Sequence, residues 1–260
     1  MEATLGAEAT SADKWQEWAS RHQALLLGLC VAVALLLRLH ALFAESFVNR
    51  DAVYYLDLAE KWSRADFATL MAGDPRLHVL PMYCFFVKLA IQAGLAPLTA
   101  ALAVNLALGT ALVPVMYGCG RALFASRGMG LLTALLTAVH PIFVDVSVQV
   151  FREDPMLLGL GAALWLAVKG EKKLHWWLGS GVGVAFAILS RYEALEAVGA
   201  AGVYLGLNWA LGVAKVRGQI AKYGCFLLGV AMGIALFSLM MGIPWRFYDV
   251  NFINRVKDYL

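Results

Sequence analysis

Carboxylates and arginines recur beside aromatic residues at the ends of the long apolar runs of this chain. The first instance is the stretch 50–55 (RDAVYY), which follows the apolar run 24–44. Asp51 could accept a proton as a general base or bind a metal, and it could equally cap a helix that begins at Ala52. Ionisable groups at the mouth of a membrane span cost free energy to keep there, so Asp51 is a functional candidate.

The second instance is the stretch 151–155 (FREDP), which separates two apolar runs with almost no loop. Asp154 before Pro155 is typical of a helix start, with an acidic cap and a proline at the first helical position. That pattern explains Asp154 without chemistry, but it does not explain Arg152 and Glu153. For this cluster we favour a functional role.

The third instance is the stretch 189–193 (LSRYE), which joins two more apolar runs almost without a linker. Arg191 could simply pair with its neighbour Glu193 at the membrane edge. We favour an arginine that meets an anionic lipid headgroup, because a guanidinium group matches phosphate oxygens in bidentate geometry. His78 is a weaker candidate, since a lone histidine is more often structural.

The composition is that of an integral membrane protein. Of the 260 residues, 61% are hydrophobic and 15% are charged, whereas a soluble domain has roughly 25% charged residues. No run of Lys and Arg with interleaved aromatic residues is present, which argues against nucleic acid as a partner. The four cysteines show no C-x-x-C spacing, so we expect neither a disulfide nor a cysteine metal site.

We predict an all-α, multi-pass membrane protein with about seven transmembrane helices. It would lie in the plasma (inner) membrane of a bacterium or in the ER membrane of a eukaryote. Most of the apolar runs are near the roughly 20 residues that a crossing needs. The predicted spans are 24–44, 98–119, 128–146, 155–168, 174–189, 192–212 and 223–243.

Two further helices are expected in the first outer loop. Residues 51–66 are amphipathic, and such a helix can lie in the membrane interface with Trp62 at headgroup level. The apolar run 79–94 is short and polar at two positions, so we interpret it as a re-entrant or protein-packed helix. Arg38 and His40 lie near the outer end of the first span, where their side chains are expected either to snorkel toward water or to pack against other helices.

The charges of the short loops orient these helices. Eight Lys and Arg residues against one acid mark three of the loops, which are 120–128, 169–174 and 214–222. The positive-inside rule places these loops, with the tail at 1–21, in the cytoplasm. Seven crossings, with residues 79–94 not crossing, then bring Asp51, Glu153 and Arg191 to the outer face, together with the C-terminal segment 244–260. If residues 79–94 cross as well, Asp51 lies on the opposite side from the others.

In their order along the chain, these motifs resemble the N-terminal module of GT-C-type glycosyltransferases. The branch in question includes protein O-mannosyltransferases and lipid A aminoarabinose transferases. The resemblance covers residues 22–243, which form the expected transmembrane module. Its motifs are RDxxYY at 50–55, HxxPxY at 78–83, RxLFxxR at 121–127, HP before REDP at 140–155 and LSRxE at 189–193.

The resemblance implies transfer of a sugar from a polyprenyl-phosphate donor to a lipid, glycan or protein on the extracytoplasmic face, with inversion. It implies Asp51 as the catalytic base or as a group that positions the acceptor. Metal dependence stays open: a divalent cation such as Mg or Mn could bind Asp51, Glu153 and Asp154, or these acids could act without one. The residues expected to bind donor or acceptor are Arg50, Tyr54, Tyr55, His78, Arg152, Glu153, Asp154, Arg191 and Glu193.

Besides a glycosyltransferase whose partners are a lipid-linked donor and the membrane lipids, two other functions stay open. Members of the family run longer than this chain, which ends at Leu260, and many carry a second acid where Ala52 stands. The chain could therefore be a non-catalytic subunit that a second chain completes. A transporter or lipid flippase is the other alternative, but such proteins place their sites near the middle of the membrane.

Overall fold

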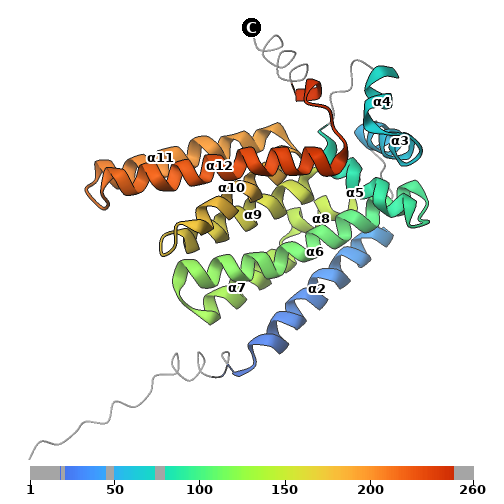
Figure 1. Ribbon diagram of the computed structural model, residues 1–260. Coiled ribbons are helices and arrows are strands. Elements are labelled where there is room, and N and C mark those ends of the chain that lie inside the picture. Colours follow the sequence, from blue (N-terminus) through green and yellow to red (C-terminus); the bar gives the residue numbers. More distant parts are fainter. Residues whose placement is uncertain (1–17, 19–20, 45–49, 74–79, 249–260) are drawn as a thin grey trace, which may run out of the picture.

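The computed structural model describes residues 18, 21–44, 50–73 and 80–248, and this part of the chain contains helices and no strand (Figure 1). The all-α membrane class predicted from composition is confirmed. In chain order, the helices are α2 (Gln23–Ala44), α3 (Arg50–Arg64), α4 (Phe67–Gly73), α5 (Pro81–Gln92), α6 (Pro97–Phe124), α7 (Arg127–Val139), α8 (Pro141–Val148), α9 (Glu153–Gly170), α10 (His175–Ile188), the 3-10 turn η1 (Tyr192–Leu195), α11 (Glu196–Ala210) and α12 (Val216–Met241).

The long helices pack side by side in a row. Helix α10 contacts both α9 and α12, α6 contacts both α7 and α9, α2 lies against α6, α7 and α8, and α11 lies against α12. The shorter helices α3, α4 and α5 gather at one end of this row, where α6 begins and α12 ends (Figure 1). The turns α6–α7, α9–α10 and α11–α12 lie at the opposite end (Figure 1).

The prediction of seven membrane spans is wrong for the described part of the chain. Three helices, α2, α6 and α12, are long and apolar enough to cross a membrane. A fourth crossing exists if α7 and α8 form one broken span, since they are bent by 52° at the break. Of the three remaining predicted spans, α10 has 14 residues and α11 has 15, fewer than the roughly 20 that a bilayer core requires. The third, α9, has 18 residues and carries Glu153, Asp154 and Lys169.

Glycines of the run 179–183 let α10 approach its neighbours closely. A Cβ atom at Gly181 would overlap the carbonyl oxygen of Phe226 in α12, and one at Gly183 would lie 3.0 Å from the carbonyl oxygen of Gly159 in α9. Close backbone contact of this kind is a main source of helix association in membranes, where burial of apolar surface contributes little between helices.

The amphipathic helix at 51–66 forms, but its apolar face is turned into the protein. Trp62 is 1% exposed, and its ring lies 4.7 Å from that of Phe67 and 5.7 Å from that of Phe85. The expectation that Trp62 meets lipid headgroups is therefore wrong, because α5 covers the apolar face of α3. Helix α5 itself is protein-packed, as expected, with a buried N-terminal half.

Candidate functional site

Arg191 is the centre of a group of ion pairs at the end of the helix row. It lies in extended backbone between α10 and η1, and its Nη2 and Nε atoms donate to the two oxygens of Glu193 at 2.8 and 3.2 Å. Its Nη1 atom donates to Glu153 Oε1 in the first turn of α9. Two stretches that are 38 residues apart in the chain thus meet through one guanidinium group.

Tyr55 joins the first-loop helix α3 to the same group. The guanidinium carbon of Arg152 lies 5.1 Å from the centre of the Tyr55 ring, a cation–π contact. Burial raises the pKa of the Tyr55 phenol; the charges of Asp51 and Glu153 add to this increase, and Arg152 opposes it. Tyr55, Arg152, Glu153, Arg191 and Glu193 are called the polar cluster below.

Backbone contacts explain why these segments meet. The Met82 N–H at the start of α5 donates to the carbonyl oxygen of Leu189 at the end of α10, at 3.1 Å. The rings of Tyr55 and Tyr83 then pack edge to face, with centres 6.0 Å apart. Helix α5 therefore holds α3 against the turn that carries Arg191.

The charges within the cluster are strongly coupled. The hydrogen bonds from Arg191 hold the pKa of Glu193 at about 2, well below its ordinary value of 4.5. The same contact raises the pKa of Arg191, so both groups stay ionised at neutral pH. A guanidinium group has five N–H donors, and the bonds to Glu153 and Glu193 use three of them. Arg191 can therefore still donate to a phosphate oxygen.

Asp51 lies beside the cluster and not within its ion pairs. It is exposed, in the first turn of α3, four residues before Tyr55 and on the same side of the helix. Because α3 begins at Arg50, Asp51 does not cap a helix that starts at Ala52. Because its carboxylate is exposed next to the arginines of the cluster, Asp51 is placed to contact a second substrate.

Asp154 departs from its expected place at the mouth of the site. It does not cap α9, which begins one residue earlier at Glu153. It is 2% exposed, and its Oδ1 atom lies 3.0 Å from the Ser147 hydroxyl of α8. The Nε atom of Arg38 donates to the same hydroxyl at 3.1 Å. Asp154 is thus held beneath the cluster, away from the solvent.

The remaining predicted residues fall outside the cluster. Tyr54 is 37% exposed, whereas Tyr55 is 6% exposed, because adjacent helical residues point in different directions. His78 and the side chain of Arg50 lie outside the described residues. Within the described part, no three His, Cys, Asp or Glu side chains gather closely enough to hold a metal ion, so Asp51, Glu153 and Asp154 form no ready-made metal site.

The sequence interpretation gave no role at the site to the buried polar residues below the cluster. Arg38 was expected either to snorkel or to pack between helices, and it packs, since it is 0% exposed. Asn105 of α6 is also 0% exposed, and its amide donates to the carbonyl oxygens of Gln149 and Phe151 at 2.5 and 3.1 Å. An arginine or asparagine inside an apolar helix is itself the signal, since such a residue usually faces protein.

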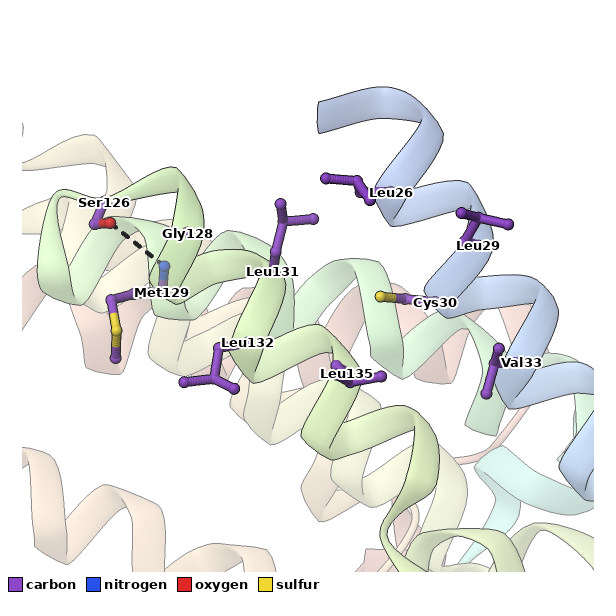
Figure 2. A pocket seen from close by; sticks show the side chains of 10 residues that line it. All are labelled: Leu26, Leu29, Cys30, Val33, Ser126, Gly128, Met129, Leu131, Leu132 and Leu135. Atoms are coloured by element: carbon purple, nitrogen blue, oxygen red, sulfur yellow. Dashed lines mark hydrogen bonds between the residues drawn. The ribbon is translucent and has the colours of Figure 1, made fainter. Parts of the chain in front are cut away.

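Two apolar grooves open on the sides of the helices. One, of about 510 Å³, lies between α2 and α7, and Leu26, Val33 and Leu132 are among its walls (Figure 2). The other, of about 550 Å³, is bordered by side chains of α9, α10 and α11. No residue of the polar cluster lines either groove.

Comparison with known families gives a match over most of the chain. A family model described as dolichyl-phosphate-mannose-protein mannosyltransferase matches residues 76–242, which is more than half of the 260 residues. The matched region includes Arg152, Glu153, Arg191 and Glu193, and Asp51 lies before it. No curated protein and no solved structure matches the chain.

Proposed function

This chain belongs to the dolichyl-phosphate-mannose-protein mannosyltransferase family and is a membrane glycosyltransferase of the GT-C type, and on that premise we propose that it uses a polyprenyl-phosphate sugar, with mannose as the first sugar to test. The sugar passes to a hydroxyl or amine of a lipid, glycan or protein. We place this transfer at the polar cluster and on the extracytoplasmic face.

The observation that carries this proposal is the arrangement of Arg191 between Glu153 and Glu193, with Arg152 next to Glu153 in the chain and against the Tyr55 ring. The two carboxylates orient the guanidinium group, and donors remain on it for an anionic ligand. Arg152 brings a second positive charge to the same end of the helices. Such a pair of arginines suits a lipid phosphate, whose charge increases when the sugar leaves.

The chemistry would be a direct displacement. The acceptor oxygen or nitrogen attacks the anomeric carbon as the bond from that carbon to the phosphate oxygen breaks. The bonding electrons leave with the polyprenyl phosphate, where Arg191 stabilises the new charge. Asp51 takes the proton from the acceptor, because it is exposed and not engaged in the ion pairs of the cluster.

The distribution of charge supports transfer on the extracytoplasmic face. The basic turns α6–α7, α9–α10 and α11–α12 lie at the end of the helices opposite to α3 and α5 (Figure 1). If those turns face the cytoplasm, the cluster faces the other side of the membrane. Exposed apolar side chains between the two ends, including the α2–α7 groove, offer a surface for a polyprenyl tail.

A transfer assay on purified protein in lipid nanodiscs tests this function. The donor is polyprenyl-phosphate mannose with labelled sugar, and a membrane extract supplies acceptors. We expect transfer by the wild type and a fall of about 100-fold or more in Asp51→Asn, in line with the loss of a general base. Asp57→Asn is the matched control, since Asp57 is an exposed acid of the same helix and its carboxylate pairs with Lys61 on the helix surface.

Each outcome has a separate meaning. Equal activity in the wild type and Asp51→Asn would eliminate Asp51 as the base. No transfer by the wild type from polyprenyl-phosphate mannose or from other polyprenyl-phosphate sugars would contradict the proposed activity and favour a non-catalytic subunit.

A further inference from the structure

Arg38 connects three helices at a point deep in the protein. It lies on α2, and its Nη1 atom donates to the carbonyl oxygen of Ala138 at 3.4 Å, in the last turn of α7. Its Nη2 atom donates to the carbonyl oxygen of Phe143 in α8 at 3.2 Å. Because Pro141 has no N–H and breaks the helix there, carbonyl groups near the break need donors from elsewhere.

Ser147 carries this connection from α8 to α9. Its hydroxyl accepts from Arg38 Nε and shares its hydrogen between the carbonyl oxygen of Phe143, at 2.7 Å, and Asp154 Oδ1, at 3.0 Å. The chain of contacts therefore runs from Arg38 through Ser147 to Asp154. Asp154 is the neighbour of Glu153, which contacts Arg191.

Space for this chain of contacts is set by Gly109 of α6. A Cβ atom there would overlap the Ser147 hydroxyl and would lie 3.0 Å from Asp154 Oδ1. One turn earlier on α6, Asn105 donates to the carbonyl oxygens of Gln149 and Phe151. Both ends of the turn from α8 to α9 are thus held by buried side chains of other helices.

We propose that Arg38, through Ser147 and Asp154, positions the turn from α8 to α9 so that Glu153 meets Arg191 in the orientation that transfer requires. This inference rests on the proposed glycosyl transfer and adds Arg38, Ser147 and Asp154 to it as positioning residues. Asp154 then acts through its neighbour and not on the substrate, in agreement with its 2% exposure. These hydrogen bonds link the first membrane helix, α2, to the site.

Ser147→Ala and Asp154→Asn test the connection with small changes in volume. Ser180→Ala is the matched control, because Ser180 is also a buried serine that bridges two helices, through a 2.8 Å bond to the carbonyl oxygen of Ala163. We expect kcat to fall roughly tenfold or more in each test variant, since displacements of about 1 Å can cost that much. We expect KM for the donor to change by less than about threefold, because Arg191 keeps its bonds to Glu193.

The double variant gives the sharper measurement. If both residues act through one chain of contacts, the double variant Ser147→Ala, Asp154→Asn should have about the same kcat as whichever single variant has the lower kcat. Multiplied losses would mean independent effects and would overturn the proposal. A kcat of Ser147→Ala equal to that of Ser180→Ala, with comparable falls in melting temperature, would overturn it as well.

Hydrogen exchange provides a readout that does not depend on activity. In Ser147→Ala and in Arg38→Met, amides of residues 150–157 should exchange roughly tenfold faster than in the wild type, and Ser180→Ala should leave them unchanged. Unchanged exchange in the test variants would refute the positioning role. A wild type without transferase activity but with this exchange pattern would refute the proposed function alone.

Discussion

Replacement of Arg191 by lysine separates the geometry of the guanidinium group from its charge. Arg191 donates to both oxygens of Glu193 and to Glu153. A lysine keeps the positive charge but cannot form paired planar contacts with a carboxylate or a phosphate. A hydrogen bond to a charged group is worth about 1.5–3 kcal/mol. Loss of one such bond to the leaving phosphate therefore predicts a fall in kcat/KM of roughly 10- to 150-fold, at about 1.4 kcal/mol for each factor of ten.

The assay compares wild type, Arg191→Lys and Arg217→Lys in the same nanodiscs, with labelled polyprenyl-phosphate mannose. Arg217 is an exposed arginine at the start of α12, so its replacement should leave kcat/KM within about twofold, as is usual for an exposed charge. Melting temperatures measured in parallel separate a loss of folding from a loss of geometry. A folded Arg191→Lys protein with wild-type kcat/KM would refute the assignment of Arg191 to the phosphate.

Three further predictions concern stability. Gly109→Ala should destabilise the protein by about 1–3 kcal/mol or more through overpacking. Gly206→Ala is the control: no atom lies within 4 Å of the added group, so it should be neutral or stabilising by up to about 1 kcal/mol. Denaturation curves in matched detergent compare the two variants, and equal stability would contradict the tight contact at Gly109. Trp62→Ala should cost about 3–5 kcal/mol, and a small loss in the same measurement would restore a position at the membrane surface. Because Arg191 lowers the pKa of Glu193 from 4.5 to about 2, this carboxylate contributes stability above pH 4.5 that is lost as the pH falls through 2. The contribution is at most about 1 kcal/mol, since the side chain is 56% exposed. Melting temperatures of wild type and Glu193→Gln should therefore converge on acidification, and a constant difference would contradict the ion pair.

Much of the site could be predicted because its residues are close to apolar runs in the chain. Short loops between helices bring their residues to the ends of the helix row, so Arg152, Glu153 and Arg191 had to lie at such an end. The two helices between them, α9 and α10, run out and back, so these residues share one end of the row. The direct contact of Glu153 with Arg191 could not be predicted, because it depends on how α9 and α10 pack at Gly159 and Gly183.

The amino-acid sequence by itself determined the helical membrane class and the order of the family motifs, because composition and hydrophobic runs are local properties. Only the tertiary structure decided which face of each helix meets protein. Trp62 and Arg38 lie on helices that look ready to meet lipid or water, and both are buried because α5 and α8 cover them. The structure also decided the number of spans. The break at Pro141 divides a run that looks continuous in the sequence, and α10 and α11 end before they reach the length of a crossing.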